Sequence, residues 1–124
     1  MTASKTRASS FSFPKHRRLT HSAEFDQVKH SGSTRGGKLL MLNFAPVESS
    51  VPCRVGLIAS RRIGGAVARN RVRRRLREIV RCHQHDLRNR FWIVLVAKRD
   101  AVNASYHELE HEVLRLARRA SILL

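Results

Sequence analysis

The clearest pattern of apolar and polar positions in this chain runs from residue 66 to residue 81. The stretch holds no proline and no glycine, and at about 100° per residue its apolar side chains fall within about a third of a helix. These apolar positions are Ala68, Val72, Leu76, Ile79 and Val80. The opposite side is polar and consists almost entirely of arginine. The pattern therefore predicts a helix with one face in a hydrophobic core and the other facing an outside partner.

Three other segments have the composition of β-strands. Residues 39–44 and 54–60 are short apolar runs that follow a Gly-Gly pair and a proline-bounded connection, and residues 91–97 form an unbroken apolar run. An unbroken run of this length is typical of a strand that is covered on both faces. The order strand, helix, strand across residues 54–97 indicates a βαβ unit with parallel strands.

Two further helices flank these elements. The first is expected from Ser22, as its N-cap, to His30, with Gly32 as the stop signal. The second is expected to begin at Ser105, and its apolar stripe consists of Leu109, Val113, Leu116, Ala117 and Ala120. The predicted order is therefore α-β-β-α-β-α in an α/β fold, with room for one more short strand.

The length of 124 residues fits a single domain. Residues 1–12 are a run of small, hydroxyl and basic residues without an acid or any periodicity, so we expect a disordered basic arm there. The same composition overlaps with that of organelle transit peptides, and that alternative stays open. Residues 13–124 are expected to form the folded domain.

The formal net charge of +16 narrows the class of partner to nucleic acid or an anionic membrane. Twenty of the 25 basic residues are arginine, whose planar fork matches phosphate oxygens and stacks on bases. The longest apolar run, residues 91–97, is too short to span a bilayer, so we expect no membrane partner. Cys53 and Cys82 are the only cysteines, which favours a reduced cytoplasmic protein without a disulfide.

Nine arginines and a single acid, Glu78, occupy residues 61–81. Like charges one turn apart destabilise an isolated helix, so we expect an anion to cover this face. A merely solvated surface mixes charges of both signs, and this one does not. Asn70 lies at its centre and can bond 2′-hydroxyls, base edges or a metal-bound water. Because DNA-binding patterns such as helix-turn-helix, zinc finger or zipper are absent, structured RNA is the expected partner rather than DNA.

Residues 107–111 match the H-E-x-x-H pattern of zinc proteases, but we expect no metal there. Both histidines lie opposite the apolar stripe of the last helix, and Ser105 with Glu108 has the spacing of a capping box. His83 and His85 are interpreted as the solvated end of the arginine-rich helix, or as an extra phosphate contact when protonated.

Carboxylates for a two-metal nuclease site are equally hard to find. The chain has nine acids, and Glu108, Glu110 and Glu112, expected on one exposed helix, cannot all point to one place. Gly64 and Gly65 lack the rest of a P-loop and are interpreted as a tight turn into the helix. The sequence therefore predicts no catalytic residue and no metal ligand in the protein.

Residues 54–77 resemble the signature of the bacterial ribonuclease P protein component. They contain an Arg-Asn-Arg core at residues 69–71, followed by further basic residues at positions 73, 74 and 77. Residues 13–25 resemble the N-terminal block of the family, and residues 91–99 resemble its hydrophobic strand that ends in a basic pair. The resemblance covers residues 13–120.

This resemblance implies an α+β two-layer sandwich similar to ribosomal protein S5 domain 2, with a left-handed βαβ crossover. It also implies that the protein assists a catalytic RNA in the endonucleolytic removal of the 5′ leader from precursor tRNA. The RNA subunit would carry out the hydrolysis with Mg²⁺ that it binds itself, and the protein would hold no cofactor. The implied partners are ribonuclease P RNA and the precursor tRNA leader.

The resemblance also implies two groups of site residues. The contacts with the catalytic RNA would be Arg61, Arg62, Arg69, Asn70, Arg71, Arg73, Arg74 and Arg77. A leader-binding cleft between the first helix and the sheet would hold Phe25, Lys29 and Phe44. Because family members usually carry an aromatic residue where this chain has Lys29, leader binding is expected to rely more on charge here. The alternative function is a ribosomal or RNA-chaperone-like protein that binds structured RNA without an enzymatic partner.

Overall fold

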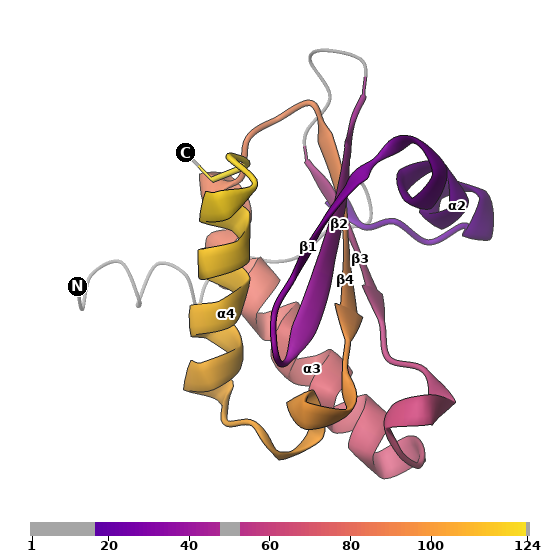
Figure 1. Cartoon of the computed structure of the whole chain (residues 1–124), viewed down its shortest axis with the longest axis vertical. Coiled ribbons are helices and arrows are strands. Elements are labelled where there is room, and N and C mark those ends of the chain that lie inside the picture. Colours follow the sequence, from indigo (N-terminus) through magenta and orange to yellow (C-terminus); the bar gives the residue numbers. More distant parts are fainter. Residues whose placement is uncertain (1–16, 48–52, 124) are drawn as a thin grey trace.

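The computed structural model describes residues 17–47 and 53–123 (Figure 1). The expected basic arm, residues 1–12, lies outside the described residues. In chain order the helices and strands are α2 (Ser22–Ser31), β1 (Ser33–Gly36), β2 (Leu40–Pro46), β3 (Arg54–Ile58), η2 (Arg61–Ile63), α3 (Ala66–His83), η3 (Gln84–Asp86), β4 (Phe91–Ala97), η4 (Arg99–Asn103) and α4 (Tyr106–Arg119).

The four strands form one mixed sheet in the order β1-β2-β4-β3. β2 pairs antiparallel with both β1 and β4, whereas β3 and β4 are parallel neighbours joined through α3. The predicted βαβ unit is therefore confirmed. The one described strand missing from the predicted order is β1, which is the extra short strand for which the sequence left room.

Both faces of the sheet are covered by helices. α3 and α4 pack on one face and α2 packs on the other, as Figure 1 shows. Along β4, Ile93 and Leu95 point to the α3/α4 side, whereas Trp92 and Val94 point to the α2 side. The unbroken apolar run of β4 was correctly predicted to be covered on both faces. α2 thus adds a third, smaller layer to the expected two-layer sandwich.

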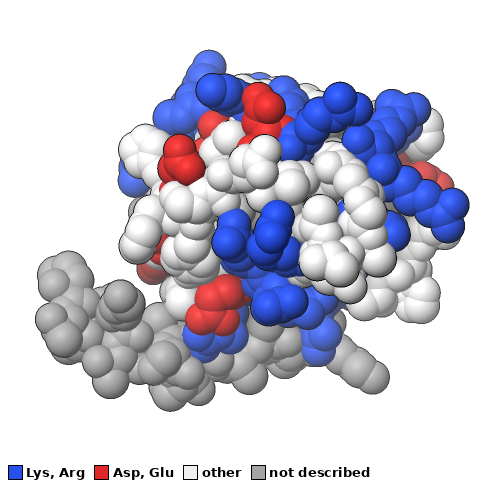
Figure 2. All heavy atoms as spheres, turned by 90° about the horizontal axis from the view of Figure 1, so that it is seen from below, with Lys and Arg blue, Asp and Glu red and all other residues white. Residues whose placement is uncertain are grey.

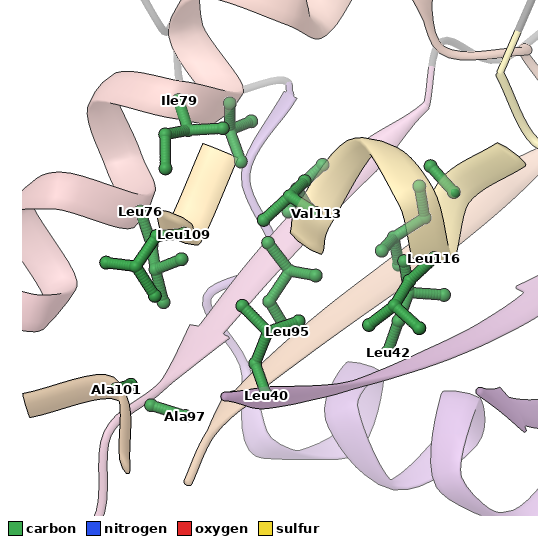
Figure 3. Close-up of a cluster of buried hydrophobic side chains, with 14 of the residues drawn as sticks. Leu40, Leu42, Leu76, Ile79, Leu95, Ala97, Ala101, Leu109, Val113 and Leu116 are labelled. Carbon is green, nitrogen blue, oxygen red and sulfur yellow. The ribbon is translucent and has the colours of Figure 1, made fainter. Parts of the chain in front are cut away.

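The main core lies between the sheet and the helices α3 and α4 (Figure 3). Leu76 of α3 and Leu109 and Leu116 of α4 pack here with Leu42 and Leu95 of the sheet, all of them almost fully buried. The predicted apolar stripes of both helices are confirmed, with one position of the α3 stripe, Ala68, only half-buried. This packing turns the polar side of α3 away from the protein.

The ends of α2 differ slightly from the sequence prediction. Its N-cap is His21 rather than Ser22, and the Glu24 carboxylate accepts hydrogen bonds of 3.0 Å from the Thr20 and His21 N–H groups. Gly32 ends the helix as predicted. A Cβ there would lie 2.3 Å from the Phe44 carbonyl oxygen of β2, so the close approach of the two backbones requires glycine. None of the helices in residues 17–47 and 53–123 could span a membrane, and both cysteines are free.

Glu112 corrects one expectation about α4, because it is buried rather than exposed, with only 7% of its surface accessible. Its Oε2 accepts hydrogen bonds from the N–H groups of Leu39 (2.7 Å) and Leu40 (2.9 Å). A Cβ at Gly37 would lie 2.4 Å from the same oxygen, so the turn packs directly on the carboxylate. Glu112 therefore holds the β1–β2 turn against α4.

Candidate nucleic-acid interface

The polar side of α3 points away from the sheet and carries most of the predicted RNA contacts. The exposed ones are Asn70, Arg71, Arg74 and Arg77. Arg69 and Arg73 are half-buried along one flank of this row. The side chains that anchor the helix, Val72 and Leu76 among them, occupy its opposite side and fix which residues face outward.

Arg61 and Arg62 complete the predicted set from the short helix η2, which packs beside the start of α3. Both side chains are exposed. Gly64 has a φ of 151°, a conformation that favours glycine, so the predicted role of the glycine pair in the turn is confirmed at this position. All eight predicted contacts therefore lie between the start of η2 and Arg77 of α3. Figure 2, seen from the end of the molecule where α3 begins, shows basic groups across the face.

Arg73 is held in place by the protein itself. Its Nη1 donates to Asn70 Oδ1 at 3.3 Å, and its Nη2 donates to the Ala59 carbonyl at 3.4 Å. The first contact fixes the amide of Asn70 at the centre of the basic face, with its oxygen toward the guanidinium. The Asn70 NH₂ group is then the part of this side chain that faces an outside acceptor.

Two arginines on the other flank of α3 bind backbone carbonyls that follow β4. Arg75 Nη1 donates to the Ala104 carbonyl at 2.6 Å, and Arg71 Nη2 donates to the Val102 carbonyl at 3.3 Å. Arg75 is half-buried and was not among the predicted RNA contacts. These bonds tie η4 and the start of α4 to α3. The arginine-rich helix thus contains arginines that brace the fold as well as arginines that point outward.

The single acid of the arginine-rich segment, Glu78, is neutralised locally. Its carboxylate pairs with Arg81 one turn later, and this hydrogen bond lowers the pKa of Glu78. Among the residues that the structure describes, no ion pair reaches an arginine between positions 61 and 77. The positive charge is therefore uncompensated over η2 and the first three turns of α3.

The second predicted group, the leader cleft, is only partly brought together. Phe25 is half-buried between α2 and the sheet, where a Cβ at Gly56 of β3 would lie 2.4 Å from its ring. Lys29 follows one turn later on α2 and is exposed. Phe25 and Lys29 thus lie on the α2 side of the sheet, as expected.

The expected position of Phe44 in the same cleft is wrong. Phe44 packs against the main core on the α3/α4 side of the sheet, with its ring centroid 6.2 Å from that of Phe91. The guanidinium of Arg35 lies 5.6 Å above the same ring. Side chains alternate along a strand, so Phe44 shares a face with the buried Leu40 and Leu42 rather than with Phe25.

Half-buried apolar side chains that sequence reasoning missed lie on the α2 side instead. Met41 of β2, Val96 of β4 and Ile58 of β3 follow one another across the sheet, because Met41 pairs with Val96 and Val96 pairs with Ile58. No alternation of apolar and polar residues marks these positions in the sequence, because residues 39–42, 57–59 and 91–97 are unbroken apolar runs.

Arg54 of β3 fixes α2 on this face. Its Nη1 pairs with Glu24 at 2.7 Å, and its guanidinium lies 5.4 Å from the centre of the Trp92 ring. Burial of the Glu24 carboxylate opposes its charge, but the bonds from His21, Thr20 and Arg54 together lower its pKa. The ion pair thus joins the first turn of α2 to the sheet beside Phe25.

The histidines singled out in the sequence lie on α3, η3 and α4. His107 and His111 are exposed, and Ser105 and Glu108 make the predicted capping box. His83 differs from the solvated helix end that was expected, because it is half-buried and its Nε2 lies 2.8 Å from Glu110 Oε2, which links α3 to α4. Within the described residues, no group of three or more His, Cys, Asp or Glu side chains could hold a metal ion.

Comparison with known proteins gives a consistent result. Residues 13–121 match the family model of ribonuclease P. The chain is 34% identical over 106 residues to the ribonuclease P protein component of Symbiobacterium thermophilum, across 86% of this chain and 92% of that one. It is 39% identical over 106 residues to the corresponding protein of Dehalococcoides mccartyi, across 86% of each chain.

Solved structures share the fold. The ribonuclease P protein of Staphylococcus aureus is similar with a TM-score of 0.79 at 19% identity, over 89% of this chain and 100% of that chain. The protein from Thermotoga maritima is similar with a TM-score of 0.74 at 22% identity, over 82% of this chain and 96% of that chain.

Proposed function

The chain belongs to the ribonuclease P protein component family, and from this premise we propose that α3 docks it on the catalytic RNA of the enzyme. Family membership makes the protein an RNA-binding subunit in tRNA processing. The docking residues proposed are those predicted from the sequence: Arg61, Arg62, Arg69, Asn70, Arg71, Arg73, Arg74 and Arg77.

One observation carries this proposal. The exposed arginines at the start of α3 have no acidic partner among the described residues, and they lie at one end of a rigid helix whose other face is buried. Arginine binds phosphate oxygens through two parallel N–H groups, so a row of this kind suits an RNA backbone. The NH₂ group of Asn70 adds a neutral donor that can bond a 2′-hydroxyl or a base edge.

We further propose that the RNA carries out the hydrolysis and binds the Mg²⁺ that the reaction uses. The described part of the protein has no carboxylate cluster for a two-metal site, and most of its acids are engaged in structural contacts. The arginines would act by neutralising RNA phosphates, which lets negatively charged strands approach and lowers the Mg²⁺ concentration that the RNA needs.

The leader of precursor tRNA is proposed to lie on the α2 side of the sheet. We propose that Phe25 and Lys29 contact the leader. Phe44 does not, because it faces the α3/α4 side of the sheet. The half-buried apolar row of Met41, Val96 and Ile58 supplies a surface on which unpaired bases can pack. Lys29, exposed on α2, adds a positive charge that suits the phosphates of a single strand.

Reconstitution tests the function directly. The protein mixed with ribonuclease P RNA is expected to raise 5′-leader cleavage of precursor tRNA at low Mg²⁺, and the Arg74→Ala/Arg77→Ala double variant is expected to lose most of this effect. A His107→Ala/His111→Ala variant is the control and should cleave normally. No stimulation, together with equal binding to any structured RNA, would instead support a ribosomal or RNA-chaperone-like protein.

A further inference from the structure

A single large apolar side chain stands in solvent among residues 17–47 and 53–123. Val67, in the first turn of α3, has 80% of its surface exposed. Neither the fold nor helix formation accounts for a valine there. Its side chain contributes nothing to the core, and a β-branched residue is a poorer helix former than alanine or arginine.

The surroundings of Val67 are the basic face itself. Residues three and four positions apart are neighbours on a helix, so Asn70 and Arg71 lie one turn from Val67 and Arg74 lies two turns away. All three are exposed. On the other side a Cβ added at Gly65 would have no atom within 4 Å, so the protein leaves the approach to Val67 open. A partner that covers Asn70 and Arg71 therefore covers Val67 as well.

We propose that Val67 contacts an unpaired base or a ribose of the RNA that binds α3. This inference rests on the proposed docking of α3. Phosphates satisfy the arginines around Val67, but an isopropyl group gains nothing from a phosphate. The apolar surfaces that RNA offers are the faces of bases that are splayed out of a helix and the C–H edges of the sugar. Val67 thus marks a place where the bound RNA presents a nucleoside rather than only its backbone.

The test compares loss of affinity with loss of salt dependence. Val67→Ala should weaken binding to ribonuclease P RNA about three- to tenfold, because up to two methyl groups lose their contact. The slope of log affinity against log salt should stay unchanged, because no phosphate contact is removed. Val67→Leu, which keeps an apolar side chain, should lose less affinity than Val67→Ala. Folding is not at risk, since alanine favours the helix.

Arg74→Ala is the matched variant two turns along the same face, and it should lower both the affinity and the salt slope. If Arg74→Ala behaves in this way while Val67→Ala binds like the unaltered protein, the inference about Val67 is wrong and the docking of α3 stands. If Val67→Ala changes the salt dependence as much as the loss of one phosphate contact would, the substitution has displaced the helix on the RNA. This result also overturns the inference. If neither variant changes binding, the docking proposal itself fails.

Discussion

Two neighbouring arginines of α3 provide a sharp test of how the basic face works. Arg74 is exposed and belongs to the proposed RNA contacts, whereas Arg75 is half-buried and donates a 2.6 Å hydrogen bond to the Ala104 carbonyl. The two residues carry the same charge and occupy adjacent positions in the same helix, so they differ mainly in their surroundings. We predict that Arg74→Ala reduces RNA binding without affecting folding, and that Arg75→Ala mainly reduces folding stability.

The magnitudes follow from the contacts. Affinity falls as salt rises, and each phosphate contact of arginine makes the slope of log affinity against log salt steeper by about 0.7 to 0.9. Arg74→Ala should therefore make this slope shallower by about 0.8. Between 50 and 200 mM salt, the factor by which the variant loses affinity should then be about three times smaller than the factor for the unaltered protein. Arg75→Ala removes a charge-assisted hydrogen bond and should lower the free energy of unfolding by about 1.5 kcal/mol.

Two measurements separate the variants. Binding to ribonuclease P RNA at several salt concentrations gives the slope, and urea unfolding gives the free energy. Arg77→Ala, a second exposed position, should repeat the behaviour of Arg74→Ala, with a change in unfolding free energy within about 0.5 kcal/mol. Equal slopes for the Arg74 variant and the unaltered protein would refute the reasoning, because the exposed face would then be merely solvated.

Two further substitutions test the packing that positions these surfaces. Glu112→Ala leaves the buried N–H groups of Leu39 and Leu40 without an acceptor. It should lower the unfolding free energy, measured by urea titration, by about 3 kcal/mol. A loss below about 1 kcal/mol would mean that Glu112 does not hold the β1–β2 turn. Gly56→Ala should lower the free energy of unfolding by about 1 to 3 kcal/mol, because the new Cβ would lie 2.4 Å from the Phe25 ring. An unchanged midpoint of urea unfolding would show that α2 moves aside freely.

The helices could be predicted from the sequence because their signals are local. The spacing of Leu76 and Ile79 identifies the buried side of α3, and the pair Ser105 and Glu108 marks the start of α4. These interactions join residues within one or two turns of the same helix. The exposed arginines can be predicted from the same helical spacing, since they occupy the part of the helix surface that the apolar stripe does not cover.

The position of Phe44 needed information from outside its strand. Alternation shows that Phe44 shares a face with Leu40 and Leu42, but it does not tell which helix covers that face. The paired strands and the crossing of α2 over the sheet decide this, and both are long-range features.

The division of labour among the arginines could not be predicted for a different reason. Arg73 and Arg75 bind the backbone carbonyls of Ala59 and Ala104, which lie 14 and 29 positions away in the chain. Every residue has a carbonyl, so such an acceptor leaves no trace in the sequence. Only the folded structure distinguishes an arginine that braces η4 from one that points outward.

The placement of the described acids explains why the basic face of α3 is left without an opposing charge in the free protein. Several described acids are held by contacts within the protein. Glu24 with Arg54, Glu110 with His83 and Glu112 with the β1–β2 turn connect different elements, whereas Glu78 pairs with Arg81 inside α3. No ion pair among the described residues reaches an arginine between positions 61 and 77. Like charges one turn apart destabilise the free helix there. Since the described residues supply no opposing charge, RNA phosphates would relieve this repulsion on binding, and the bound protein should therefore unfold at higher urea than the free protein.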